Sequence, residues 1–244
     1  MANMTQVLMV GSFLVTSAGL SACANMGTIP SLGCSEMHLS PAPVVSERIE
    51  FDTFSVNSPQ FGTWCQSPKT NQTLVYTSSP MFGHEITSSL DRDLTLNSLV
   101  LMVRYVRTLK SPLNDVDQLQ SFHQRWMKAG GIITVSAGQA WANFVSLDRF
   151  RVLSYSATPN LPIAGKCIQY ESRAEEHNNP AAPDKIFYLH DVGAVCLDPI
   201  RKGRLIWAIL SERYIPEKQF RPKLFAQLRD KTAKPFFASL QLKK

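Results

Sequence analysis

Apolar and polar positions alternate with the period of a β-strand along much of the chain. Every second residue is apolar in the run Leu99, Leu101, Val103 and Tyr105, which is typical of a strand with one buried face. Residues 205–210 are continuously apolar, and we interpret them as a central strand. Strands are predicted over residues 49–56, 74–77, 99–108, 132–136, 150–155, 167–172, 187–197 and 205–213.

One internal segment has helical spacing instead. Apolar residues recur there at intervals of three or four, at Val116, Leu119, Phe122 and Trp126. We expect this helix to begin at Ser111-Pro112 or to be capped by Asn114, with Asp117 three residues later. Gly130-Gly131 is predicted to end it.

The tail from Pro222 to about Leu240 is also helical in pattern. Pro235 is expected to break or restart that helix, because proline lacks a backbone N–H donor. The order of strands, helix, strands and helix predicts a single α+β domain over residues 46–244, an antiparallel sheet with helices packed on it.

The amino-terminal region has a different character. Residues 7–20 form an uncharged apolar run of 14 residues, which is shorter than a typical membrane-spanning helix and suits a signal peptide. The sequence Leu20-Ser21-Ala22-Cys23 follows, and it resembles the lipobox of bacterial lipoproteins. The resemblance implies a cleaved signal peptide over residues 1–22 and fatty acylation of Cys23, with palmitate as a typical chain.

Residues 23–45 are expected to form a lipidated flexible tether, since glycine and proline recur in them. In the enterobacterial sorting pattern, Ala24 in place of aspartate favours the outer membrane. The first six residues contain no lysine or arginine, whereas a signal peptide normally starts with a positive charge. A buried N-terminal helix with a chance cysteine therefore stays open as an alternative.

A second resemblance covers about 80 residues of the last third of the chain. It is carried by Gly165-Lys-Cys-Ile-Gln-Tyr170, Gly193-Ala-Val-Cys-Leu-Asp-Pro199, Ser211-Glu-Arg-Tyr214 and Phe236-Phe-Ala-Ser-Leu240. These segments resemble uncharacterised proteobacterial lipoproteins, with a PsbP-like α/β sandwich as a further relative. The resemblance implies two cysteines on neighbouring strands and a final helix across the sheet. It supplies no catalytic residue.

Four cysteines remain besides Cys23, and they are Cys34, Cys65, Cys167 and Cys196. An even number in an exported protein suggests two disulfides, for which three connectivities exist. We favour Cys34–Cys65 and Cys167–Cys196, because the members of each pair lie in neighbouring segments. Buried free thiols or a metal site are the alternatives, although the sequence has no C-x-x-C motif.

Composition adds little to the functional picture. The chain is 44% hydrophobic and 18% charged, as is ordinary for a globular protein, and it has a formal net charge of +6. It contains no block of five or six basic residues and no basic–aromatic stripe, so no nucleic-acid partner is expected. Attraction to acidic surfaces stays open.

Motifs for a nucleophile elbow, a phosphate loop, a dinucleotide fold or a zinc protease are absent. We therefore expect no catalytic, cofactor-binding or metal-binding residue. The histidines are expected to be structural, with His123 at the boundary of the first helix; the five are His38, His84, His123, His177 and His190. His84-Glu85 and His190-Asp191 are adjacent acid–imidazole pairs, but neighbours on a strand point to opposite faces.

Two polar or aromatic groups have competing interpretations. Arg173, Glu175, Glu176 and His177 are expected in a solvated hairpin connection, with a polar binding loop as the alternative. Three tryptophans are expected in the core rather than along a groove, and they are Trp126, Trp141 and Trp207.

The sequence thus predicts a lipid-anchored protein of the bacterial envelope, facing the periplasm, with a non-catalytic binding, structural or adaptor role. Its expected partners are the membrane, through the lipid, and an envelope protein. An envelope hydrolase with a site assembled only in three dimensions is one alternative. A soluble intracellular protein with a fortuitous apolar run is the other.

Overall fold

The computed structural model divides the chain into two compact units, Met1–Pro30 and Ser31–Lys244. The structure describes residue 34 and residues 39–43, 45–62, 64–71, 73–78, 98–107, 112–129, 131–136, 139–144, 149–159, 165–179, 183–214 and 222–243, all in the second unit. The predicted signal peptide, Cys23, most of the predicted tether, His38 and His84 lie outside the described residues.

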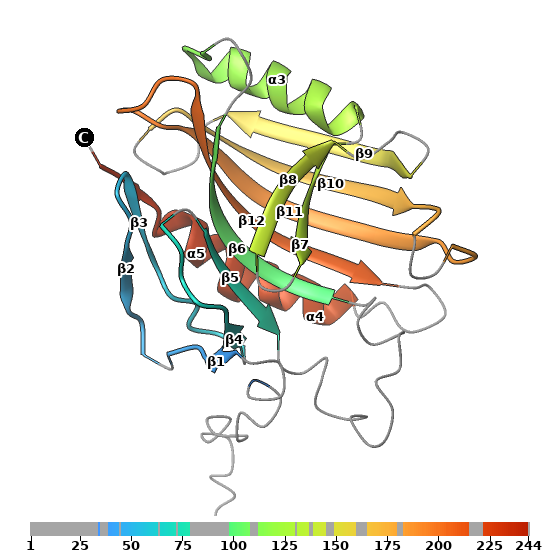
Figure 1. The fold of residues 1–244 in the computed structure, drawn as a ribbon, viewed down its shortest axis with the longest axis horizontal. Helices are drawn as coiled ribbons and strands as arrows, with labels where there is room; N and C mark the ends of the chain where they lie inside the picture. The colour runs from blue at the N-terminus through green and yellow to red at the C-terminus, as the bar shows by residue number, and fades with distance from the viewer. Residues whose placement is uncertain are drawn as a thin grey trace, which may run out of the picture. The chain divides into compact units, whose positions relative to one another are not determined.

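An eight-stranded antiparallel sheet forms the centre of this unit (Figure 1). Strand β12 lies between β11 and β6 in the interior of the sheet, and residues 205–210 are buried along it, which confirms the central strand. The strands follow the spatial order β1 (Ser40–Pro41), β4 (Trp64–Gln66), β5 (Thr73–Ser78), β6 (Ser98–Arg107), β12 (Arg204–Tyr214), β11 (Phe187–Leu197), β10 (Cys167–Glu176) and β9 (Phe150–Pro159).

Two smaller sheets accompany it. Strands β2 (Arg48–Glu50), β3 (Phe54–Asn57) and β13 (Gln241–Leu242) form one, and β7 (Gly131–Ser136) pairs with β8 (Gln139–Phe144) in the other. The single strand expected over residues 49–56 is wrong, because the chain turns back at Asp52-Thr53. The Phe51 backbone N–H donates to the Phe54 carbonyl at 2.9 Å and closes that turn.

Helix α3 (Val116–Lys128) begins one residue later than the sequence indicated. Its N-cap is Asp115, whose carboxylate accepts from the Gln118 backbone N–H at 2.8 Å. The Gln118 side chain in turn accepts from the Asn114 backbone N–H at 3.0 Å. Asn114 is therefore not the cap. Asn114 and Asp115 are both good capping residue types, and Asp115 is the one whose side chain accepts from a first-turn backbone N–H.

The α-helical pattern of the tail is interrupted just before Pro235 and restarts there, in line with the expected break or restart. The tail consists of α4 (Pro222–Leu228), a π-helical segment η3 (Arg229–Ala233) and α5 (Lys234–Ala238). The Lys234 backbone N–H reaches the Arg229 carbonyl, five residues back. Proline has no N–H for an α-helical hydrogen bond, and its ring clashes with the carbonyl four residues earlier. The wider π turn before Pro235 accommodates this missing bond and the ring.

Helices cover both faces of the large sheet, so the unit has three layers. On one face α3 packs through Leu119 and Trp126 against Trp207 of β12. On the other, Phe225, Phe236 and the small sheet of β2, β3 and β13 enclose a second core. The protein is therefore a mixed one built mostly of antiparallel strands, as expected at the level of fold class.

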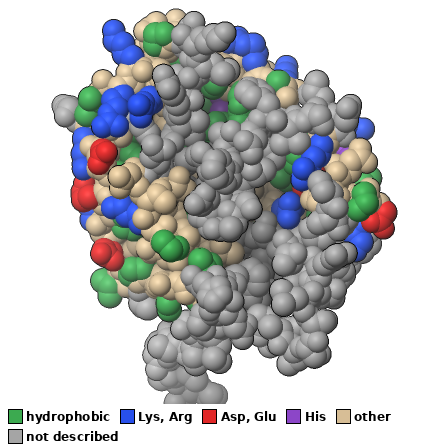
Figure 2. Space-filling view, in the orientation of Figure 1, with side chains coloured by type: hydrophobic (Ala, Val, Ile, Leu, Met, Phe, Trp, Pro, Cys, Tyr) green, Lys and Arg blue, Asp and Glu red, His purple; other side chains and the backbone are tan. Residues whose placement is uncertain are grey.

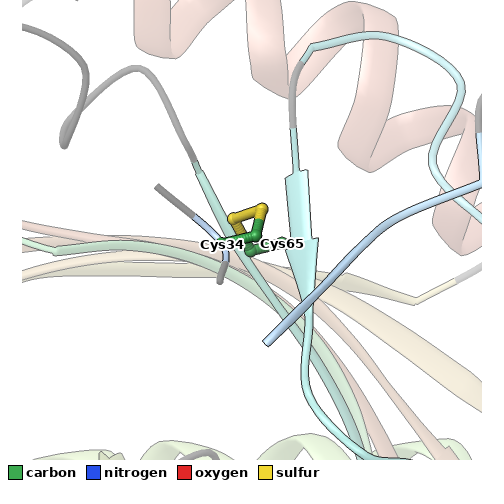
Figure 3. The surroundings of a disulfide bond; sticks show 2 residues. All are labelled: Cys34 and Cys65. Carbon is green, nitrogen blue, oxygen red and sulfur yellow. A yellow bond between two sulfur atoms is a disulfide. The ribbon is translucent and has the colours of Figure 1, made fainter. Parts of the chain in front are cut away.

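Both disulfides favoured from the sequence are present in the structure. Cys34 is bonded to Cys65 of β4, with 5.3 Å between their Cα atoms (Figure 3). Cys167 and Cys196 are direct cross-strand partners in β10 and β11, and they are bonded to each other. All four residues are buried, so the bonds lie within the folded body.

Candidate functional site

A polar pocket lies between one edge of the large sheet and the C-terminal helix, with a volume of about 390 Å³. Ser156 on β9 is the register partner of Glu171 on β10, and Thr158 is the partner of Gln169. These four side chains therefore share one face of the sheet. The lining is completed by residues of β9 to β11 and by the two cations of the π-helical region: Ala157, Tyr170, Val192, Arg229 and Lys234.

Both cations of the pocket contact the same carboxylate. Lys234 Nζ lies 2.8 Å from Asp230 Oδ1, and Arg229 Nε donates to the same oxygen at 3.2 Å. Hydrogen bonds from Lys234 and Arg229 lower the pKa of Asp230 to about 2. Asp230 thus stays ionised and is paired with both cations beside the pocket.

The π-helical segment is what places these cations side by side. Arg229 and Lys234 are five residues apart, and in an ordinary α-helix they would diverge by about 140° around the axis. The bond from the Lys234 N–H to the Arg229 carbonyl instead makes one wide turn between them. Such π turns occur often at functional sites.

A histidine–carboxylate pair adjoins the pocket. His190 Nε2 lies 2.7 Å from Glu171 Oε1, and the His190 ring stacks on Phe225 of α4 with centroids 4.2 Å apart. Burial lowers the pKa of His190, and the hydrogen bond to Glu171 acts in the opposite direction. His190 faces Glu212 across β11 and β12, and burial raises the pKa of Glu212 to about 7.

The His190 ring orients Glu171 at the pocket wall. A nucleophilic mechanism needs a hydroxyl or thiol within hydrogen-bond reach of the imidazole. Within the described part of the chain, the hydrogen bond that the His190 ring makes goes to Glu171.

The opposite face of the sheet holds a second histidine in a dry aromatic cluster. His123 is fully buried, so its expected place at the helix boundary is wrong. Its Nδ1 lies 2.7 Å from the Tyr155 hydroxyl, and its ring contacts Tyr170 and Trp207 with centroids 4.3 and 4.8 Å away. Burial lowers the pKa of His123 to about 3, which makes it a neutral core residue.

The polar residues expected in a hairpin connection belong largely to strand β10. Arg173, Glu175 and Glu176 all lie on it, and His177 follows. Glu176 is only 1% exposed, and it pairs with Arg149 and with Arg213, the latter at 3.3 Å. The solvated interpretation is therefore wrong for Glu176. Buried and less buried side chains continue to alternate along β10 beyond the apolar part of its sequence. At the C-terminal end of the strand, ion pairs of buried Glu176 replace apolar contacts.

The remaining candidates behave as the sequence indicated where they are described. Trp126 and Trp207 are buried against each other, with ring centroids 4.7 Å apart, while the Trp141 side chain lies outside the described residues. His190 and Asp191 point to opposite faces. Asp191 hydrogen bonds to Ser211, and burial raises its pKa to about 6.

Sequence reasoning missed the pocket and the Glu171–His190 pair, although one signal was available. The Cys167–Cys196 bond fixes the register of β10 against β11. With Cys167 opposite Cys196, the antiparallel register places Arg173 opposite His190. Glu171 lies two residues before Arg173 on the same face, so it is a diagonal neighbour of His190. Nothing comparable in the sequence brings the C-terminal cations to these strands.

The described residues form neither a metal-binding cluster nor a membrane-spanning helix. No group of three or more histidine, cysteine, aspartate or glutamate side chains there is arranged to hold a metal ion. None of the described helices is long and apolar enough to cross a lipid bilayer.

The sequence matches no protein-family model and no curated protein. Among solved structures, it is similar to the Ran-binding protein Mog1p of Saccharomyces cerevisiae, with 12% identity and a TM-score of 0.35 over 81% of this chain and 95% of that one. A mutant of Mog1 gives 13% identity and a TM-score of 0.36 over 81% and 96% of the two chains. Similarities of this size assign no family and no function to the chain.

Proposed function

We propose that this chain is a lipid-anchored protein of the bacterial cell envelope, with a folded periplasmic domain that binds a ligand without catalysis. The observation that carries the proposal is the pair of buried disulfides in a body that follows an apolar leader and Cys23. Disulfides persist in exported proteins and are rare in the reducing cytosol. This supports export over the intracellular alternative.

The binding role is supported by the pocket rather than by an apolar surface. The described large apolar side chains that are exposed come from separate segments, and they are Val45, Leu153, Ile186 and Ile200. On the face drawn in Figure 2, the described lysine and arginine side chains form separate groups and not a continuous stripe. The pocket between β9, β10 and the C-terminal helix is a concave site with converging polar groups.

The anchor is tested on the protein isolated from its own cells. We expect mass spectrometry of the amino terminus to find an acylated Cys23, and membrane fractions to contain the protein. A Cys23→Ser variant should keep its leader and lose the lipid mass, whereas the Ser21→Ala variant should be processed normally, because both residues are small. An intact, unacylated Met1 in wild-type protein would reject the proposal.

The disulfides are tested on the same material. Non-reducing peptide mapping should recover peptides that join Cys34 to Cys65 and Cys167 to Cys196. Four free thiols in exported protein would remove the main support for an oxidising compartment.

A further inference from the structure

We propose that the pocket binds an acidic saccharide, with the carboxylate or phosphate of the ligand held by Arg229 and Lys234 and its hydroxyl groups held by β9 and β10. The proposal rests on the binding role argued above, but it does not depend on the lipid anchor. Three features of the pocket carry it: unused cationic donors, an opposite wall of unused polar groups, and a size suited to a small polar molecule.

The cations have donors left over after they contact Asp230. Arg229 uses Nε and Nη2 on Asp230, and the described residues offer no partner to its Nη1. Lys234 has three donors, of which Asp230 Oδ1 takes one. About half of the Lys234 side chain is exposed, at 55%. Planar guanidinium and mobile ammonium donors on one side of a pocket suit an oxyanion.

The opposite wall is built from hydroxyl and amide groups on adjacent strands. Within the described residues, the side chains of Ser156, Thr158 and Gln169 have no hydrogen-bond partner in the protein, so they are available to a ligand. They alternate along β9 and β10 on one face, as the register requires. A row of such groups matches the hydroxyls of a sugar better than an apolar molecule.

Glu171 sets the orientation of the ligand. Its carboxylate is fixed by His190 at 2.7 Å and lines the same pocket as the two cations. The Glu171 carboxylate at the pocket wall repels the anionic end of a ligand and accepts hydrogen bonds from the hydroxyl groups of the ligand. The volume of about 390 Å³ falls in the lower part of the range for small-molecule sites. One acidic sugar unit, with one charge and several hydroxyls, fits this distribution.

The test is calorimetric titration of the full chain, purified in detergent, with glucuronate, glucose 6-phosphate and glucose. We expect both acidic sugars to bind, and glucose to bind at least about tenfold more weakly, because it lacks the charge-assisted contacts. The two acidic probes separate a carboxylate site from a phosphate site. Equal binding of glucose, or no heat from either acidic sugar, would overturn the proposal.

Variants locate the binding. Arg229→Gln and Lys234→Gln should each weaken glucuronate or glucose 6-phosphate binding about tenfold. Lys231→Gln is the matched control, since Lys231 belongs to the same π-helical segment but lies over the Phe61 ring and does not line the pocket. Thermal melting of each variant checks folding, and Thr158→Val tests the sheet wall without any change in charge. An equal loss with Lys231→Gln would mean only a general charge effect and would reject the assigned site.

Failure of this test is distinguishable from failure of the anchor. If Cys23 is acylated but neither acidic sugar binds, the lipid-anchor proposal stands and the sugar-site proposal falls. If an acidic sugar binds to a chain with an intact Met1, the sugar-site proposal stands and the lipid-anchor proposal falls.

Discussion

The two faces of the large sheet use the same strands for opposite purposes. Tyr170 and Glu171 are neighbours on β10, yet the ring of Tyr170 packs in the buried aromatic cluster around His123, whereas the side chain of Glu171 pairs with His190 beside the polar pocket. Of the described histidines, His123 lies on one face and His190 on the other, and burial lowers the pKa of both. Only His190 has a carboxylate partner at a cavity. Residue type therefore does not decide the role, and the layer packed over each face does.

The largest effect expected from this comparison comes from the aromatic face. Trp207→Ala should destabilise the protein by roughly 3–5 kcal/mol, because it empties a buried site that Trp126, His123 and Tyr170 surround. Thr158→Ala in the pocket wall should change stability by less than about 0.5 kcal/mol, since it is exposed. Urea denaturation measures both. Similar losses would show that the two faces do not differ in packing.

The second prediction concerns pH. His123 has a pKa of about 3 when folded against 6.5 as its model value, so the unfolded chain takes up this proton first as the pH falls. The histidine therefore costs about 1.4 kcal/mol of stability per pH unit within that window. Glu212, on the pocket face, has a pKa raised from 4.5 to about 7, so the folded chain protonates first. Glu212 therefore adds stability on acidification through its own window, and its penalty returns as the pH rises to 7.

These opposite slopes are separated with two variants. Denaturation of wild type, His123→Phe and Glu212→Gln should be followed between pH 4.5 and pH 6.5, the window in which both groups act. Relative to His123→Phe, the wild type should weaken as the pH falls. Relative to Glu212→Gln, it should strengthen. Parallel curves for all three proteins would contradict the assigned burial of both groups.

The smallest change in stability is expected at Asp230, which lies at the surface. Asp230→Asn should leave the melting temperature nearly unchanged, because exposed ion pairs contribute little. It should also tighten the binding of glucuronate several-fold, because Arg229 and Lys234 then face the pocket without a competing carboxylate. Calorimetry measures the affinity. Weaker binding would show instead that Asp230 is needed to hold the two cations in place.

Local sequence was a good guide wherever apolar side chains follow a single period. The strands that became β5, β6, β11 and β12 lie within a residue or two of their predicted bounds. Three of the predicted boundaries are wrong because a turn, a side-chain cap or an ion pair has more influence there than the apolar periodicity. The turn at Asp52-Thr53 divides an alternating run, the bond from Gln118 selects Asp115 as the cap, and ion pairs extend β10 to Glu176.

The candidate site was predictable only in part. The pairing of Cys167 with Cys196 could have fixed the register that brings Glu171 to His190, because both pairs lie on the same two strands. The cations could not be placed in this way. Pro235 marks where the helix restarts, but its position does not reveal the preceding π turn that sets Arg229 and Lys234 side by side.

The sequence by itself predicted most of the long strands, the two helical regions and the cysteine pairing, because periodicity and caps act over short stretches of chain. The envelope address stays a prediction. Only the tertiary structure decided which side chains of each strand enter a core and which line the pocket. That choice depends on α3 covering one side and the C-terminal helix covering the other. Contacts between segments tens of residues apart set the burial of each side chain, and burial sets its charge and its chemistry.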